Sequence, residues 1–360
     1  MPSKSTIDSL RGRIDRIDAR VLKLLNQRAR LALRIGHAKM RRRNEVYVPG
    51  RERGIYDQLF ALNQGPLPNE AVRTIYREVI SASRALEKPL RIAYLGPEAT
   101  FTHMAAREQF GSQATFVSAE TIPQVFAAVE RGHSDYGAVP VENSTEGVVG
   151  TTLDMFVESP LNILSELSLE IRHCLLSHSG FLKRIKRVLS HPQSLAQCRR
   201  WLATHLPGVP VEETTSNARA AEIAAQDSAA AAIAGKLAAE RYGLKIVAEG
   251  IQDQSANLTR FVVIGQPQDN SLSTGHDKTS ILFSVRDEVG VLYRMLKPFA
   301  ENRINLIHIE SRPLKGRPWE YLFFLDVEGH LHEESIDRAV QELAKGCLFV
   351  KVLGSYPVWR

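Results

Sequence analysis

The chain has 360 residues, of which 44% are hydrophobic and 24% are charged. This is the composition of a globular protein, and the length allows two or three domains. No apolar run approaches the length of a membrane span, and the first residues lead directly into a helical pattern, so we expect a cytoplasmic protein with no membrane partner. Cys174, Cys198 and Cys347 lack the CxxC spacing of metal-binding or redox motifs, so we expect reduced thiols and no metal or other cofactor.

The positive charge is concentrated in the N-terminal segment. Residues 1–88 contain 19 lysines and arginines against 9 acidic residues, a net charge of +10, whereas the remainder carries −4. This segment is therefore where an anion is expected to bind. Nucleic acid is one alternative, since Arg41, Arg42 and Arg43 are consecutive. The other charges are interleaved with apolar residues instead of forming one basic block, which favours a solvated loop at these three residues and no nucleic acid.

A single cation, Arg28, interrupts the apolar face of the first predicted helix, residues 7–40. A desolvated guanidinium needs an anionic partner, and its planar donors suit a carboxylate. Lys39 lies eleven residues after Arg28, close to three helical turns, and so projects on nearly the same face. We expect a carboxylate-binding site here; the alternative is a coiled-coil arm in which Arg28 only sets the register. Spacings of four and three residues define the face: Leu10, Ile14, Ile17, Val21, Leu24, Arg28, Leu31, Ile35 and Ala38.

Two shorter helices are predicted at residues 51–63 and 68–87, after breaks rich in proline and glycine at 48–50 and 65–68. The first helix would be roughly 50 Å long at ~1.5 Å per residue, far longer than the other two can cover. Its remaining apolar face therefore predicts pairing with a second copy of the chain.

From residue 90 the hydrophobic period changes, and short strands alternate with helices, which predicts α/β architecture with ligands at the carboxyl ends of strands. A polar, turn-rich stretch at residues 266–278 is predicted to be a linker. The residues after it have the order βαββαβ of a small ferredoxin-like module. The strands are expected at 90–95, 136–141, 188–190, 245–248, 260–264, 279–285, 304–310, 320–327 and 349–355, and the helices at 122–131, 195–205, 217–225, 289–302 and 335–345.

Three groups of motifs, in order along the chain, each resemble a known family. All-helical chorismate mutases are resembled by the first group, SLRGRIDRIDARVLKLLNQRARLALRIGHAKM, PGRERG and ISASRALE. Prephenate dehydratases are resembled by the second group, RIAYLGPEATFTHMAA, GAVPVENSTEGVV, LSHPQSLAQCRRWL and NLTRFVVIG. The phenylalanine-sensing ACT domain is resembled by the third, KTSILFSVRDEVGVLYRMLKPFAENRINLIHIESRP. Together they resemble the bifunctional chorismate mutase/prephenate dehydratases. The resemblance implies an all-α domain at residues 1–88, a two-lobed α/β domain like periplasmic binding proteins at 90–266, and an α+β ACT domain at 278–356.

The resemblance also assigns the mutase residues. The rearrangement of chorismate is concerted, so the site needs only cations for two carboxylates and donors at the breaking ether oxygen. Lys39 is assigned to a carboxylate and the ether oxygen, and Ser83 to the ring carboxylate. Two positions depart from the commonest pattern: Val48 replaces an aspartate, and Glu87 replaces a glutamine that donates to the ether oxygen, so Glu87 would have to stay protonated and activity should fall as pH rises. Arg28, Arg51 and, from the partner subunit, Arg11 hold the carboxylates, and Glu52 binds the substrate hydroxyl.

In the dehydratase the resemblance makes Thr259 the signature catalytic residue, which we assign to positioning and hydrogen donation at the leaving hydroxyl. Arg260 follows it on a strand and is expected to point to the opposite face. Thr100 and nearby backbone amides of the GPEATF loop would face an anion. Ala99 replaces a glycine, which argues against a left-handed backbone there. The other substrate-binding positions implied by the resemblance are Glu142, Asn143, Ser144, Ser190, Gln197 and Glu213.

In the third module the resemblance implies a phenylalanine site at a subunit interface. Val291 stands where alanine is usual, so the pocket should be tighter or the feedback weaker. The implied residues are Gly290, Val291, Leu292, Glu310, Ser311, Arg312 and Pro313.

The sequence thus predicts a homodimeric enzyme that converts chorismate through prephenate to phenylpyruvate and is inhibited by phenylalanine. One alternative is a dehydratase that prefers arogenate, although the fused mutase argues for prephenate. Another is a non-catalytic, amino-acid-responsive regulator, but Thr259, Arg28 and Lys39 are all present.

Overall fold

The computed structural model describes residues 4–42, 46–254, 256–268, 272–313 and 320–358. The chain divides into two compact units. The first contains Met1–Val48, Ile55–Leu90 and Phe110–Thr115, and the second contains Pro49–Gly54, Arg91–Gln109 and Phe116–Arg360. No helix of the described residues is both long and apolar enough to cross a membrane.

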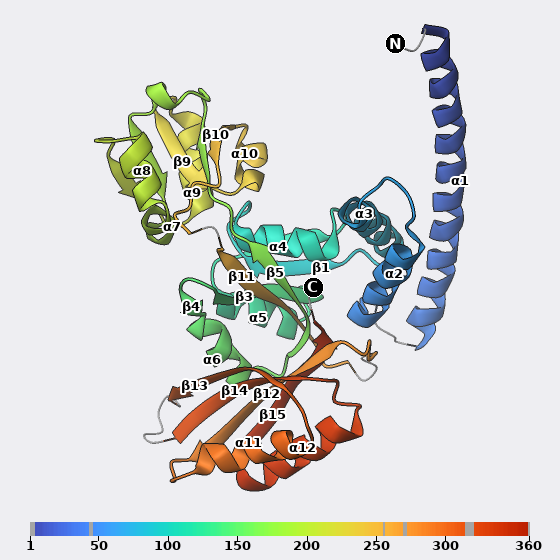
Figure 1. Ribbon diagram of the computed structural model, residues 1–360, viewed down its shortest axis with the longest axis vertical. Coiled ribbons are helices and arrows are strands. Elements are labelled where there is room, and N and C mark those ends of the chain that lie inside the picture. Colours follow the sequence, from blue (N-terminus) through green and yellow to red (C-terminus); the bar gives the residue numbers. More distant parts are fainter. Residues whose placement is uncertain (1–3, 43–45, 255, 269–271, 314–319, 359–360) are drawn as a thin grey trace. The chain divides into compact units, whose positions relative to one another are not determined.

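The first unit is helical, as predicted. It contains α1 (Lys4–Arg42), the second half of α2 (Pro49–Leu62) and α3 (Asn69–Glu87). With 39 residues, α1 extends well beyond the 19-residue α3 (Figure 1). Ala32 and Gly36 are buried near the carboxyl end of α1, whereas Ile17 is 56% and Leu24 is 62% exposed. Most of the predicted apolar face is therefore uncovered within one chain.

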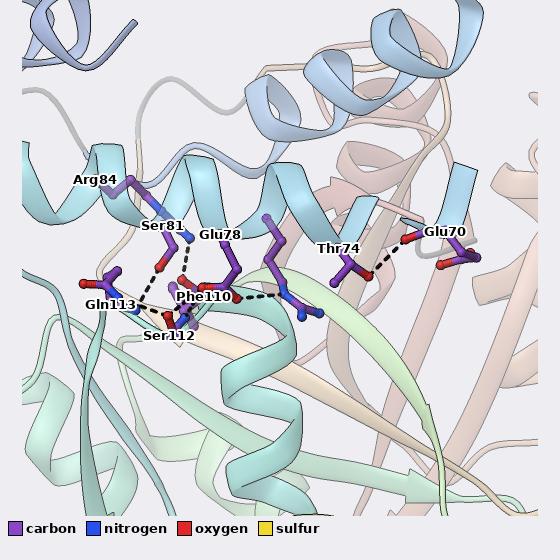
Figure 2. A network of polar contacts seen from close by, with 9 residues as sticks. Glu70, Thr74, Glu78, Ser81, Arg84, Phe110, Ser112 and Gln113 are labelled. Atoms are coloured by element: carbon purple, nitrogen blue, oxygen red, sulfur yellow. Dashed lines mark hydrogen bonds and ion pairs between the residues drawn. The ribbon is translucent and has the colours of Figure 1, made fainter. Parts of the chain in front are cut away.

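One face of α3 holds the short segment Phe110–Thr115 (Figure 2). The buried Arg84 donates from Nη2 to the carbonyl of Phe110 at 2.8 Å, and its guanidinium lies over the ring of the same residue. The Glu78 carboxylate accepts hydrogen bonds from the backbone N (3.1 Å) and Oγ (2.6 Å) of Ser112. These contacts fix the polar groups of the segment against the helix.

The second unit begins with a two-lobed α/β body. The first lobe has a sheet of order β2-β1-β3-β11-β5, with β4 beside β3. The neighbours β1 and β3 are parallel, whereas β11 is antiparallel to both β3 and β5. Its elements are β1 (Arg91–Leu95), α4 (Phe101–Phe110), β2 (Thr115–Ala119), α5 (Ile122–Glu130), β3 (Tyr136–Asn143), β4 (Gly147–Val148), α6 (Gly150–Glu158), β5 (Asn162–Glu170) and β11 (Leu258–Gly265).

The second lobe has a separate sheet of order β10-β6-β9-β7-β8. The chain enters it after β5 and returns before β11, so two crossings, residues 171–173 and 250–257, connect the lobes. The lobe consists of β6 (Cys174–Ser177), the 3-10 turn Leu182–Arg184, β7 (Arg187–Ser190), α7 (Pro192–Gln197), α8 (Arg199–His205), β8 (Val211–Glu213), α9 (Asn217–Gln226), β9 (Ala230–Ala234), α10 (Lys236–Tyr242) and β10 (Lys245–Glu249).

The C-terminal module has the predicted βαββαβ order and a sheet of order β13-β14-β12-β15. Helices α11 and α12 lie side by side along one face of this sheet (Figure 1). Leu282, Phe324 and Tyr356 on the opposite face share a hydrophobic core with the first lobe. Its elements are β12 (Asp277–Arg286), α11 (Val291–Glu301), β13 (Leu306–Pro313), β14 (Glu320–Glu328), α12 (Glu334–Gly346) and β15 (Phe349–Pro357).

The prediction of one continuous helix at residues 195–205 is wrong. Residues 195–205 form parts of two helices that are interrupted at Cys198, whose backbone has φ −114° and ψ 12°. The cause is a cap from a distant segment. Asp253 in the second crossing accepts hydrogen bonds from the backbone amides of Arg200 (3.0 Å) and Trp201 (3.2 Å), which satisfies the first amides of α8.

Candidate active sites

The first site lies where α1 faces α3. Arg28 Nη1 donates to the Oγ of Ser83 at 2.5 Å, and this hydroxyl donates in turn to the carbonyl of Val79 at 2.8 Å. In the described part of the chain Arg28 has no carboxylate partner. A half-buried guanidinium held by a neutral hydroxyl is arranged to receive an external anion.

Glu87 lies four residues after Ser83, on the same face of α3. The helices approach closely here, because a Cβ atom added to Gly36 would lie 2.8 Å from the Glu87 Cγ. Lys39 is on α1, but its side chain is outside the described residues. Arg51 and Glu52 begin α2 and belong to the second unit, so Arg28, Ser83 and Glu87 are the predicted mutase residues that the structure brings together.

Arg11 is not near Arg28 in the same chain. The seventeen intervening steps along α1 correspond to roughly 25 Å at ~1.5 Å per residue. The Arg11 side chain is 72% exposed, and its Nη1 lies 3.4 Å from Asp8 Oδ1. One chain therefore cannot place both arginines on one small substrate.

The second site is a cavity of about 310 Å³ between the lobes of the α/β body. Thr100, Asn143 and Thr259 line it from the first lobe, and Gln197 lines it from α7 of the second. His173, in the first crossing, also lines it. The cavity thus brings together residues of three motifs that are far apart in the sequence: ENS at 142–144, SHPQSLAQ at 190–197 and TRF at 259–261.

Thr259 is held so that its hydroxyl can donate. Asn143 Nδ2 donates to the Thr259 Oγ1 at 2.8 Å. The Oδ1 of Asn143 accepts from the backbone amides of Thr145 (3.0 Å) and Glu146 (3.1 Å), which fixes the orientation of the side-chain amide. Because the Thr259 oxygen already accepts one hydrogen bond, its own hydrogen remains available to a ligand in the cavity.

Arg260 points away from the cavity, as predicted. Its Nη2 lies 2.9 Å from Asp326 Oδ2 on β14, and its guanidinium is 3.7 Å from both Glu166 and Glu142. Glu142, predicted to bind substrate, is thus directed at Arg260 and not among the cavity-lining residues.

Three further predicted residues do not line the cavity. Ser144 Oγ donates to the carbonyl of Ala256 at 3.1 Å and so ties its loop to the second crossing. The fully buried Ser190 donates to the carbonyl of Ile233 at 2.7 Å. Glu213 is exposed on β8.

The expectation for Ala99 is wrong, because its backbone has φ +67° despite the Cβ. Its amide donates to His103 Nδ1 at 3.1 Å, and burial lowers the pKa of this imidazole, which keeps it a neutral acceptor. The next residue, Thr100, donates from Oγ1 to the carbonyl of Leu95 at 3.1 Å. Together these bonds offset the modest cost of a left-handed alanine, about 1–2 kcal/mol.

Sequence analysis did not predict two buried residues at this site: His173, which lines the cavity, and Asn257, which does not. His173 is 1% exposed and Asn257 is 2% exposed, and both contact Gln197, at 2.8 Å and 3.0 Å. Asn257 is the first residue of the NLTRF motif, so its place beside Thr259 in the sequence could have indicated it as a site residue. His173 has no sequence pattern around it.

The predicted sensor residues occupy two places in the C-terminal module. Gly290 caps α11 with φ +75°, and Leu292 is exposed. The ESRP motif lies on the edge strand β13. Arg312 of this motif reaches the first lobe, donating to the carbonyl of Gly150 at 2.6 Å and lying 3.4 Å from Asp154.

Among the described residues no three His, Cys, Asp or Glu side chains are placed to share a metal ion.

Known families match each module of the chain. Chorismate mutase type II matches residues 10–88, prephenate dehydratase residues 92–269 and the ACT domain residues 279–345. A bifunctional chorismate mutase/prephenate dehydratase of Aquifex aeolicus is 50% identical over 355 residues, 98% of each chain. The chain belongs to this bifunctional family. It is an enzyme with a chorismate mutase and a prephenate dehydratase domain, followed by an ACT domain.

Two solved structures resemble the last two modules. The prephenate dehydratase of Arthrobacter aurescens, determined in complex with L-Phe, has a TM-score of 0.70 and 34% identity, covering 75% of this chain and 90% of its own. GqqA, described as a novel type of quorum quenching acylase, has a TM-score of 0.69 and 30% identity, covering 74% and 98%. Since this fold supports more than one chemistry, the match over nearly the whole chain, mutase included, decides the family.

Proposed function

We propose that the two sites act in sequence in the cytoplasm: the helical module, residues 1–88, rearranges chorismate to prephenate, and the module at 90–266 converts prephenate to phenylpyruvate. The observation that carries the second step is the Thr259 hydroxyl, held by Asn143 with its hydrogen free for the cavity. Prephenate is preferred over arogenate as substrate because the chain has its own mutase.

In the mutase, Arg28 binds a substrate carboxylate while Ser83 holds the guanidinium in place. The reaction is concerted, so the residues have to fix the reactive conformer and stabilise charge on the ether oxygen. Lys39 and a protonated Glu87 supply the donors there, and Arg51 and Glu52 contribute from the start of α2.

A homodimer completes this site. Support comes from α1, whose apolar face is largely exposed, and from Arg11, which is roughly 25 Å from Arg28 along the same helix. Pairing of two α1 helices would cover the apolar residues and bring Arg11 of the second copy to the substrate.

In the dehydratase, the prephenate ring loses carbon dioxide and its hydroxyl group together and becomes aromatic. The electron pair of the breaking carbon–carbon bond enters the ring, and the hydroxide that leaves takes up one proton from the buffered solvent and is released as water. Thr259 donates a hydrogen bond to the leaving oxygen, which stabilises the charge that develops there.

The C-terminal module, residues 278–356, binds phenylalanine as the regulator. A dehydratase structure with L-Phe is a close relative, and the motifs at Gly290–Leu292 and Glu310–Pro313 are present. Phenylalanine can inhibit only if it binds the less active conformation better. The contact between Arg312 and Gly150 offers a direct path to the first lobe.

The test supplies chorismate to the purified protein and follows prephenate and phenylpyruvate separately, with and without phenylalanine. Wild-type protein should form phenylpyruvate, and phenylalanine should reduce its formation. Thr259→Val, which keeps the shape and removes the donor, should lower the dehydratase kcat by about 100-fold or more while prephenate still forms.

Thr204→Val is the matched control, because this exposed threonine on α8 only bonds its own helix. A dehydratase that is equally active with valine at residue 259 contradicts the assigned role. Absence of both reactions from the wild-type protein contradicts the proposal as a whole.

A further inference from the structure

Side-chain amides connect Thr259 to His173 in one continuous series of hydrogen bonds. The series starts at Asn143, whose Oδ1 faces two backbone amides that can only donate. Its Nδ2 must therefore be the donor, to Thr259 Oγ1 and to Asn257 Oδ1, each at 2.8 Å. The orientation of Asn143 thus fixes the orientation of Asn257.

Asn257 passes this orientation to the other lobe. With its Oδ1 directed at Asn143, its Nδ2 donates to the Oε1 of Gln197 at 3.0 Å. The same Oε1 lies 2.8 Å from His173 Nε2. Because this oxygen can only accept, the proton of the neutral imidazole must be on Nε2, and Nδ1 carries a lone pair.

The members of this series come from four parts of the body. Asn143 belongs to the first lobe and Gln197 to the second, while His173 and Asn257 lie in the two crossings. Burial lowers the pKa of His173, so the neutral imidazole required by the series is the favoured form. In the described part of the chain Nδ1 has no hydrogen-bond partner.

We propose that Asn257 is a positioning residue of the dehydratase: it carries the amide orientation that Asn143 sets beside Thr259 across to Gln197, and so holds His173 as the Nε2–H tautomer. The inference rests on the role proposed for Thr259. The tautomer of His173 is thereby fixed by a residue of the protein that joins the two lobes.

The decisive variant is Asn257→Asp, which has the same shape but cannot donate to Gln197. Either Gln197 turns its amide nitrogen toward the new carboxylate and toward His173, or the imidazole takes up a second proton. Both outcomes place a proton on His173 Nδ1. Imidazole ¹⁵N chemical shifts, assigned by comparison with His173→Gln, should report Nε2–H in the wild type and a protonated Nδ1 in the variant.

Activity gives a second readout. Asn257→Asp should lower the dehydratase kcat by about 10- to 100-fold, with a much smaller change in KM and full mutase activity. Gln252→Glu is the matched control, because it adds a charge in the same crossing and keeps the acceptor for the His173 backbone amide, 3.0 Å away. It should retain the Nε2–H tautomer and a kcat within about twofold of wild type.

Gln197→Glu gives an independent check. Its carboxylate still accepts from Asn257 and His173, so the Nε2–H tautomer should be preserved. Because residue 197 lines the cavity, the added negative charge should raise KM for a dianionic substrate. An Nδ1–H tautomer in the wild type overturns the inference. So does an unchanged tautomer in Asn257→Asp, whatever its activity. If Thr259→Val is inactive and Asn257→Asp behaves as wild type, this inference fails and the proposed function stands.

Discussion

At the scale of single residues, Gly36 determines how closely α1 can approach Glu87. A Cβ at this position would lie 2.8 Å from the Glu87 Cγ and 3.3 Å from its Cα, so the backbone of α3 would have to move as well as the side chain. Gly36→Ala should therefore lower the mutase kcat/KM by about tenfold or more, because a donor that is misplaced by a few tenths of an ångström stabilises the transition state poorly.

Separate mutase and dehydratase assays check this prediction, and the dehydratase rate should not change. Gly12→Ala is the control on the same helix, since nothing within 4 Å would meet its Cβ. It should leave the mutase unchanged and stabilise the helix by about 0.5–1 kcal/mol. Equal mutase rates for Gly36→Ala and wild type would show that Glu87 tolerates the shift or is not needed.

Sequence motifs predicted Asn143, Gln197 and Thr259, which the structure brings to one cavity. They did not predict His173 or Asn257. These two residues are 84 positions apart in the chain, and they come together only because each bonds Gln197 on α7. Ala99 shows a different limit. Its left-handed backbone depends on the His103 acceptor, which residue preference alone does not reveal.

At the scale of elements, the uncovered face of α1 leads to a test of the dimer. Burying an isoleucine or leucine contributes about 1.5–3 kcal/mol, and a charge placed in such a face adds a desolvation cost. Ile17→Glu combined with Leu24→Glu should therefore convert the dimer to a monomer in sedimentation and remove most mutase activity, because Arg11 of the second copy is lost. The dehydratase should keep its activity.

Leu62→Glu is the control for this variant, since Leu62 is 76% exposed but lies on α2. It should leave the dimer intact. A monomeric protein with full mutase activity would contradict the assignment of Arg11 to the partner subunit.

Most predicted helices and strands are confirmed. The local hydrophobic pattern of the sequence did not predict elements whose formation depends on burial by distant segments. The strand β9, Ala230–Ala234, is rich in alanine, which favours helices in isolation, yet its residues are fully buried between β6 and β7. The break at Cys198 likewise comes from Asp253, a cap supplied by a distant crossing. Both features are encoded in contacts between segments and not in the segments themselves.

At the scale of the whole second unit, a buried cluster of charges joins the first lobe to the C-terminal module. Lys278 Nζ lies 2.5 Å from Glu166 Oε2 and 3.5 Å from Asp326, which also pairs with Arg260 at 2.9 Å. Burial by itself would raise the pKa of Asp326. The Arg260 and Lys278 cations outweigh burial, so the pKa of this carboxyl is below its ordinary value.

A carboxyl whose pKa is lowered by folding stabilises the protein above its unfolded pKa, and this contribution is lost as pH falls through the folded pKa. Asp326→Asn should therefore lower the thermal midpoint at neutral pH, because removing one partner of a buried ion pair costs about 3–5 kcal/mol. The difference from wild type should shrink steadily in acid, where the wild-type carboxyl is protonated too. Thermal scans of both proteins from neutral pH downward measure it, with the exposed Asp287→Asn as a control that should follow wild type. A difference that stays constant into acid would mean that Asp326 acts through packing, and that its charge does not hold the sensor module to the catalytic lobe.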